Sequence, residues 1–221
     1  MEKFVSITGV AAPLMRSNID TDLLIPSREM TSTGKDGCGE KLLAPWRYLA
    51  SADGVRVENP DFILNQARFR DAVILLAGDN FGSGSSREAA VWALRQFGFR
   101  CVIAPSFGAI FQNNCYRNGV LPVVLAPKDV QALAEAAQDG AFLLSVDLVD
   151  CAIVQADGAR LHFSVPPAER GMLLEGLDAI GMTLKRRDEI ETFQRADRLA
   201  RPWIWQHERE ETHPGFKPPG A

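Results

Sequence analysis

The segment that most constrains the fold runs from Asp71 to Gly98 and contains three features in succession. Residues 71–77 (DAVILLA) are a short apolar run rich in branched side chains, which is typical of a buried strand. Glycines follow, and after them comes a pattern of helical character that ends at Gly98. The segment therefore predicts a strand, a glycine loop and a helix, in that order.

The same order of elements repeats in the next part of the chain. Residues 100–104 and 120–125 read as strands, and residues 106–118 between them read as a helix closed by Gly119. Strands that alternate with helices indicate a parallel sheet that is buried on both faces. The centre of the chain is therefore predicted to be a βαβ region of an α/β fold.

The C-terminal third changes character after a further helix over residues 127–138. From Leu143 the apolar and polar residues alternate, which predicts an antiparallel hairpin that turns at Asp157-Gly158. Pro166-Pro167 is expected to begin one helix, and Thr183 to cap another that runs towards Leu199. Antiparallel strands therefore flank the predicted parallel centre.

Length and composition favour one domain followed by a tail. A chain of 221 residues with 46% apolar side chains can bury a substantial core. We expect this domain to cover residues 1–205. Residues 206–221 are polar and proline-rich, a composition typical of disordered segments, and are predicted to form a C-terminal tail.

The charge pattern argues against two classes of partner. The net charge is only −4, and no Lys/Arg tract is long enough to follow a phosphate backbone, so we expect no nucleic-acid partner. No apolar stretch approaches the roughly 20 residues needed to cross a bilayer, and residues 1–9 lack the pattern of a secretory signal. The predictions are no membrane association and a cytoplasmic location.

The cysteines do not suggest a metal site. Cys38, Cys101, Cys115 and Cys151 lie far apart, form no CxxC pair, and are accompanied by only three histidines. Buried thiols are the simplest interpretation. We therefore expect this chain to ligate no metal.

The glycine loop has the composition of an anion site. Its sequence, NFGSGSSRE over residues 80–88, has glycines at 82 and 84 that permit positive φ and a close approach of the backbone. The first turn of the next helix would offer unpaired N–H groups and the positive end of a dipole. A carboxylate or a phosphate would fit such a loop.

Three standard motifs fail when they are compared with this loop. A P-loop needs Gly-Lys-Ser/Thr, and the dinucleotide fingerprint needs glycine where Arg87 stands. A nucleophile elbow needs glycine two residues after its serine, but Ser85 is followed by Ser86 and Arg87. Two hydroxyls and a guanidinium beside an anion site remain.

Simpler roles for these residues stay open at this point. Ser85 and Glu88 have the S-x-x-E spacing of a capping box, so Ser85 could serve only to start the helix. Arg87 could form a surface salt bridge. A guanidinium in the first turn opposes the helix dipole, however, and suits bidentate binding of a carboxylate.

The run from Asn80 to Leu125 resembles the small subunit of bacterial 3-isopropylmalate dehydratase and the matching swivelling domain of aconitase. The resemblance extends to residues 18–26 (NIDTDLLIP), 59–65 (NPDFILN) and 176–184 (GLDAIGMTL), and covers the chain to about Phe193. It implies an aconitase-type swivelling β/β/α domain with a central βαβ glycine-loop region and flanking antiparallel β strands.

The resemblance also implies roles for particular residues. Ser85 corresponds to the catalytic base, and Ser86 and Arg87 to residues that bind a substrate carboxylate. Similarity to aconitase places Thr21 and Asp22 at the active site, although an Asn/Asp-rich turn before a strand is an alternative interpretation of that segment.

The activity implied is that of a hydro-lyase of leucine biosynthesis. The resemblance implies that a proton is removed beside a carboxylate of a hydroxy-dicarboxylic acid, and that hydroxide departs with help from a [4Fe-4S] cluster. That cluster is expected in a partner large subunit, with no cofactor bound by this chain, and the chain is expected to be active only as part of that heteromer.

One residue departs from the family pattern. Ala89 stands where the family commonly has histidine after the SSRE segment. The alternatives are therefore a related hydro-lyase that acts on citraconate, dimethylmalate or homoaconitate, or a non-catalytic paralogue that binds anions.

Overall fold

The structure is a computed structural model that describes residues 1–30, 34–49, 55–138 and 142–209. It divides into two compact units, Met1–Asp178 and Ala179–Ala221. Residues 210–221, the greater part of the predicted tail, lie outside the described residues.

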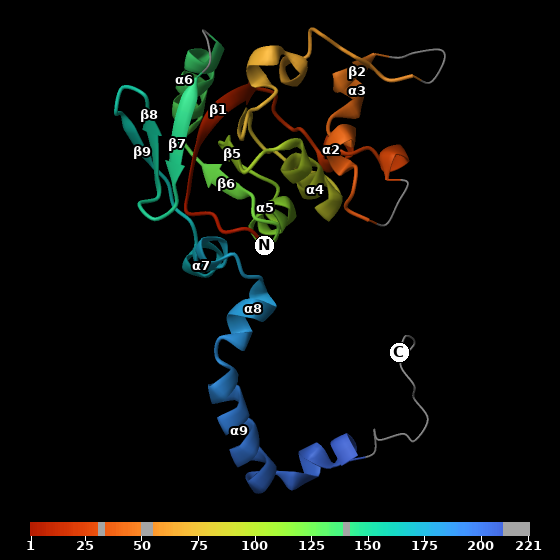
Figure 1. Ribbon diagram of the computed structural model, residues 1–221, viewed down its shortest axis with the longest axis vertical. Helices are drawn as coiled ribbons and strands as arrows, with labels where there is room; N and C mark the ends of the chain where they lie inside the picture. Colours follow the sequence, from red (N-terminus) through yellow and green to blue (C-terminus); the bar gives the residue numbers. More distant parts are fainter. Residues whose placement is uncertain (31–33, 50–54, 139–141, 210–221) are drawn as a thin grey trace. The chain divides into compact units, whose positions relative to one another are not determined.

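A seven-stranded sheet forms the centre of the first unit (Figure 1). Its strands, in spatial order, are β6 (Leu121–Val124), β5 (Cys101–Ala104), β4 (Ile74–Ala77), β1 (Ser6–Leu14), β7 (Leu143–Asp147), β8 (Ala152–Gln155) and β9 (Arg160–His162). The pairs from β6 to β1 are parallel, and those from β1 to β9 are antiparallel. The predicted combination of a parallel centre and flanking antiparallel strands is confirmed.

Strand β1 belongs to both halves of the sheet. Its C-terminal residues, Ala11–Leu14, pair in parallel with β4 and are buried, whereas Ser6–Val10 pair with β7 in the antiparallel direction and are partly exposed. Strands β4 and β5 are buried along their whole length, as expected for strands covered on both faces. The sheet therefore changes from parallel to antiparallel at β1.

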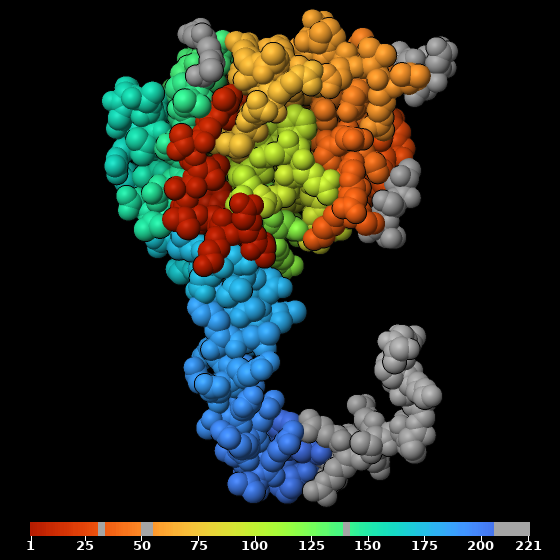
Figure 2. Space-filling view, viewed as in Figure 1, coloured from red at the N-terminus to blue at the C-terminus, as the bar shows by residue number. Residues whose placement is uncertain are grey.

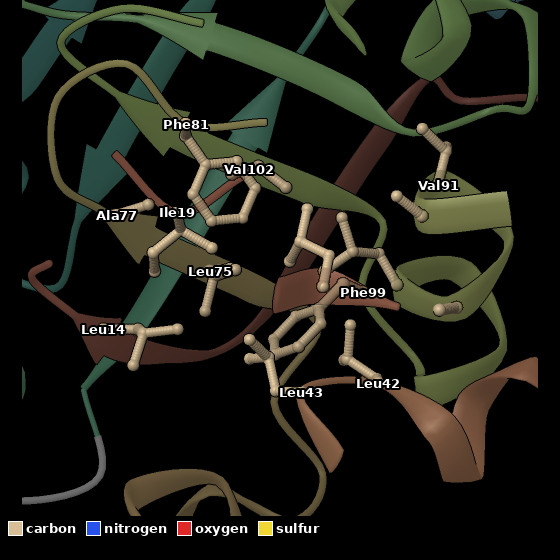
Figure 3. Close-up of a cluster of buried hydrophobic side chains, with 14 of the residues drawn as sticks. Leu14, Ile19, Leu42, Leu43, Leu75, Ala77, Phe81, Val91, Phe99 and Val102 are labelled. Atoms are coloured by element: carbon tan, nitrogen blue, oxygen red, sulfur yellow. The ribbon is translucent and has the colours of Figure 1, made fainter. Parts of the chain in front are cut away.

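Helices cover both faces of the parallel strands. Because side chains alternate along a strand, Ile74 and Leu76 of β4 point to one core, and Leu75 and Ala77 to the other. Helix α4 (Glu88–Phe97) packs in the core that Figure 3 shows, and α6 (Pro127–Gln138) packs in the opposite one. The two cores hold the parallel strands in place between helical layers.

The remaining elements of the first unit are short, apart from two helices. The two longer helices are α5 (Ala109–Arg117) and α7 (Pro167–Glu175). The short ones are α1 (Thr21–Leu24), η1 (Ser27–Glu29), α2 (Cys38–Lys41), α3 (Ala44–Arg47), η2 (Ile63–Asn65) and η3 (Ala67–Phe69), with a two-stranded ribbon of β2 (Tyr48–Leu49) and β3 (Val57–Glu58). Among the described helices, none is long and apolar enough to cross a membrane.

Most predicted boundaries agree with the structure, and one cap does not. Residues 127–138 form α6, and the β8–β9 hairpin turns at Asp157-Gly158. Thr183, however, lies inside α8 (Ala179–Leu184), where its hydroxyl donates back to the Ala179 carbonyl at 2.9 Å. Helix α9 (Arg187–Ala200) begins later, with Arg186 at its N-cap and no side-chain cap. The prediction of a Thr183 cap was therefore wrong.

Glu2 should titrate at unusually low pH. Hydrogen bonds from Arg95 and Arg100 lower the pKa of its carboxyl from about 4.5 to about 2. A group with a lowered folded pKa stabilises the fold above its unfolded pKa, and this contribution is lost as the pH falls from about 4.5 towards 2. Because the Glu2 side chain is 65% exposed, we expect its contribution to the free energy of unfolding to be less than about 1 kcal/mol.

The carboxyl ¹³C shift of Glu2, followed by NMR during an acid titration, would measure this pKa. The variant Glu2→Gln should lose stability at pH 7 but match the wild type near pH 2. A Glu2 midpoint close to 4.5 would contradict the prediction.

Candidate functional site

Three loops meet at the carboxyl edge of the parallel strands. They follow β1, β4 and β5, and isolated parallel bridges join them, between Asp20 and Ser83 and between Phe81 and Phe107. Parallel strands present their carboxyl ends at one edge, where α/β proteins commonly bind ligands. The predicted glycine loop therefore lies where its strand context predicted.

The serine loop, residues 79–87, is fastened on one side to the loop after β5. The Phe81 amide donates to the Ser106 carbonyl at 3.1 Å, and the Gly108 amide donates to the Phe81 carbonyl at 2.9 Å. The Ser106 hydroxyl also accepts from the Asn80 amide at 2.9 Å and donates to Asp79. Because residues 106–108 make these contacts, α5 begins at Ala109, three residues later than the sequence predicted.

Thr21 fastens the serine loop on the other side. Its amide donates to the Ser83 carbonyl at 3.0 Å, and its hydroxyl donates to the Ser85 carbonyl at 2.6 Å. Thr21 is only 2% exposed, and a short helix, not a strand, follows the segment. The alternative of a turn before a strand is thus wrong, and the Thr21 hydroxyl holds the backbone of a predicted site residue.

Gly82 is required by both conformation and space. Its φ is +72°, and a Cβ placed there would lie 2.1 Å from a ring atom of Phe111. Gly82→Ala should therefore lower the free energy of unfolding by about 2–5 kcal/mol, from the strained backbone and the steric overlap together.

Gly158→Ala provides a matched control for this prediction. Gly158 also has positive φ, +86°, but has no heavy atom within 4 Å of its added Cβ. Gly158→Ala should lower the free energy of unfolding only through the strained backbone, by about 1–2 kcal/mol. Urea denaturation of both variants tests the difference, and equal losses would show that the Phe111 ring moves aside.

Helix α4 begins at Glu88, and the capping-box alternative is wrong. Arg87 occupies the N-cap in an extended conformation and makes no side-chain cap bond. Glu88 instead accepts a hydrogen bond from Asn118 at 2.8 Å. The Ser85 hydroxyl therefore does not cap the helix, and the first-turn N–H groups of α4 lack the side-chain partner that a capping box would supply.

Arg87 and Asp22 form an ion pair. The Arg87 Nη1 atom lies 2.5 Å from Asp22 Oδ1 and also donates to the Ile25 carbonyl at 3.3 Å. The Arg87 side chain is 18% exposed and that of Asp22 is 52% exposed. The salt bridge foreseen as an alternative does form, but its partner is another predicted site residue. The pairing with Asp22 holds the Arg87 guanidinium against the segment that follows β1.

A pocket of about 260 Å³ opens between these loops. Thr21, Ser85 and Arg87 line one part of it, and residues 108–111 at the start of α5 line another. Ser86 is exposed and does not line this pocket. The contribution of residues 108–111 was missed at the sequence level, although they follow the strand next to the one that carries the serine loop.

Ala89 lies in the first turn of α4 and does not line the pocket. It is partly buried and packs against the core shown in Figure 3. Its methyl group thus contributes to packing in this chain.

The cysteines do not form a metal-binding group. No cluster of three or more His, Cys, Asp or Glu side chains that could hold a metal ion occurs within the described ranges. Cys101 and Cys115 are fully buried, and this burial raises the pKa of both thiols. The described residues therefore do not fit an iron–sulfur cluster.

Comparisons with known proteins agree with the fold and identify the family. The family model of the aconitase C-terminal domain matches residues 1–128. The chain is 56% identical to the 3-isopropylmalate dehydratase small subunit of Cupriavidus necator, with 92% of this chain and 98% of that protein covered. It is 47% identical to the protein of the same name from Rhodospirillum centenum, with the same coverage.

A solved structure supports the fold alone. The crystal structure of 3-isopropylmalate dehydratase from Methanocaldococcus jannaschii has a TM-score of 0.62 and 24% identity, and the match covers 86% of this chain and 99% of that one. The likeness covers much more of the chain than the central glycine-loop region, and so do the relatives named above. Both therefore support the predicted fold class. The chain therefore belongs to the family of 3-isopropylmalate dehydratase small subunits, within the aconitase superfamily.

Proposed function

We propose that this chain is the small subunit of a 3-isopropylmalate dehydratase, which interconverts 2-isopropylmalate and 3-isopropylmalate by dehydration and rehydration in leucine biosynthesis. The observation that carries the proposal is the placement of Ser85 and Arg87 on one pocket at the start of α4. The relatives named for this activity match the chain over nearly their whole length.

Arg87 is the proposed carboxylate-binding group. A guanidinium has five N–H donors in a planar fork, and the contacts with Asp22 and Ile25 use only Nη1. The pairing with Asp22 keeps the fork in place while other donors face the substrate. Ser86, exposed next to it, is proposed to donate its hydroxyl to the same carboxylate.

Ser85 is the proposed base. A serine hydroxyl is a weak base in water, so its alkoxide must be stabilised where the proton is removed. Arg87 lines the same pocket as Ser85, and its positive charge favours a negative charge there. The hydrogen bond from Thr21 to the Ser85 carbonyl holds the loop in position.

The rest of the active site is assigned to a large subunit. Ser85 is exposed to solvent and the described residues offer no group of ligands for a cluster, so a [4Fe-4S] cluster is proposed to reside in the partner. The partner must also cover Ser85 to exclude water. Four free cysteines are consistent with a reducing compartment, and we propose the cytoplasm.

Anaerobic reconstitution with the large subunit tests this function. The mixture should interconvert the two isopropylmalate isomers, whereas each subunit alone should show no turnover. A complex that turns over citraconate would keep the family and change the substrate. A complex without hydro-lyase activity on either compound would overturn the proposed function.

A further inference from the structure

The second unit exposes many large apolar side chains. We call residues 179–205 the C-terminal arm. It comprises α8, α9 and the first residues of η4 (Pro202–Arg209). Six of its large apolar side chains are at least half exposed, namely Ile180, Leu184, Phe193, Leu199, Trp203 and Ile204. Among the described side chains of the arm, only Asp197 is buried. The arm has no apolar core of its own.

Such a segment needs a surface that covers it. In Figure 1 the arm is drawn as a succession of helices, in blue as in Figure 2, and its last residues turn back onto the end of α9 through Trp205. Isolated helices of this length are marginal in water, and a core-less unit gains little from burial. Exposed aromatic and aliphatic side chains in this density are typical of a protein interface.

The end of the arm is held in one conformation. Asp197 accepts hydrogen bonds from Arg201 at 2.6 Å and from the Trp205 indole at 2.9 Å, and the Arg198 guanidinium lies 4.7 Å from the Trp205 ring centre. This network turns the chain after α9 and ties Trp205 to the helix. Trp203 lies between the tied residues Arg201 and Trp205 and is 62% exposed. A rigidly presented tryptophan costs little ordering entropy on binding.

We propose that the C-terminal arm docks on the large subunit and anchors the heteromer. The proposal rests on the proposed function, which supplies the partner. The aconitase C-terminal model stops at residue 128, but the matches to small subunits cover 92% of the chain and so must run through α8 and α9. The arm thus belongs to the part of the chain that small-subunit relatives share beyond the matched domain.

The charge of the arm indicates the chemistry of the surface that it fits. The arm has six basic and four acidic side chains, a net charge of +2, in a chain whose total is −4. It therefore fits an apolar groove with an acidic rim on the large subunit. An anchor remote in sequence from the serine loop would keep the two chains together while the active-site pocket opens to exchange substrate and product.

Binding measurements on the full-length chain test the proposal. Biolayer interferometry with immobilised large subunit should show that Trp203→Ala and Phe193→Ala each raise the Kd about tenfold or more. The kcat at saturating small subunit should stay within twofold of the wild type. Leu143→Ala, which removes a side chain 51% exposed in β7 of the first unit, is the matched control and should change the Kd less than twofold.

A second variant tests the fixed presentation of Trp203. Trp205→Phe keeps an aromatic ring but removes the hydrogen bond to Asp197, so it should raise the Kd by a smaller factor than Trp203→Ala. Circular dichroism of each variant confirms that the helices remain.

The outcomes separate docking from function. A wild-type complex whose Kd is unchanged in both arm variants overturns the docking proposal and leaves the proposed function in place. If the arm variants instead convert a free small-subunit dimer to monomer without weakening the heteromer, the occupant is a second copy and the proposal is wrong. A wild-type chain that forms no complex overturns the proposed function itself.

Discussion

Ser85→Ala is expected to lower the kcat of the reconstituted dehydratase by about 10²- to 10⁴-fold, the range that a positioned general base contributes. The substitution removes only the hydroxyl. The Thr21 hydrogen bond goes to the Ser85 carbonyl, so the loop should keep its place and the KM should change little. Initial rates with isopropylmalate, measured anaerobically at saturating large subunit, give this value.

Ser83→Ala is the matched control for the loss of a hydroxyl from this loop. Ser83 lines the same pocket and lies between the two glycines, but no chemical role is assigned to it. Its kcat should stay within about threefold of the wild type, an effect below 1 kcal/mol. If Ser85→Ala keeps more than a tenth of the wild-type kcat, the base must be sought elsewhere.

Arg87→Lys should lower kcat/KM by about 10- to 100-fold, mainly through a higher KM. Lysine keeps the positive charge but loses the planar fork, and one charge-assisted hydrogen bond contributes about 1.5–3 kcal/mol. The ion pair with Asp22 can form with either side chain, so a large effect isolates the bidentate contact with the substrate. Substrate saturation curves separate KM from kcat.

Arg95→Lys provides the control for this exchange. Arg95 makes a surface ion pair with Glu2, away from the serine loop, and its replacement should leave both kinetic constants unchanged. A double-mutant cycle of Arg87→Lys with Asp22→Asn adds a second check. If Arg87→Lys has no effect on KM, the guanidinium serves only to hold the loop through Asp22.

The elements that sequence predicted well are those whose signals are local. Residues 74–77 are continuously apolar because they are covered on both faces, and Gly98 and Gly158 occupy turns where φ is positive. The divided role of β1 could not be predicted in this way. Its partner strands lie far along the chain, and only the register shows which half of β1 meets which strand.

The candidate site shows the same division. The glycines and the serines of the loop were recognisable from local order, but the contacts that arrange them join residues 64 or 65 positions apart, Thr21 with Ser85 and Asp22 with Arg87. Local spacing also misled in one case, because Ser85 and Glu88 have the spacing of a capping box. In the structure Arg87 occupies the N-cap in an extended conformation, and no side-chain hydrogen bond caps the helix.

The shared strand β1 has a consequence for synthesis on the ribosome. The parallel half of the sheet contains β1, β4, β5 and β6, so its strands have all been made once residue 124 has left the ribosome. Residues 6–10 of β1 then still lack a partner, because β7 begins only at Leu143. The nascent chain therefore carries an open strand edge for that interval, and such an edge attracts other chains. Chaperones that bind extended segments should recognise this intermediate at its N-terminus.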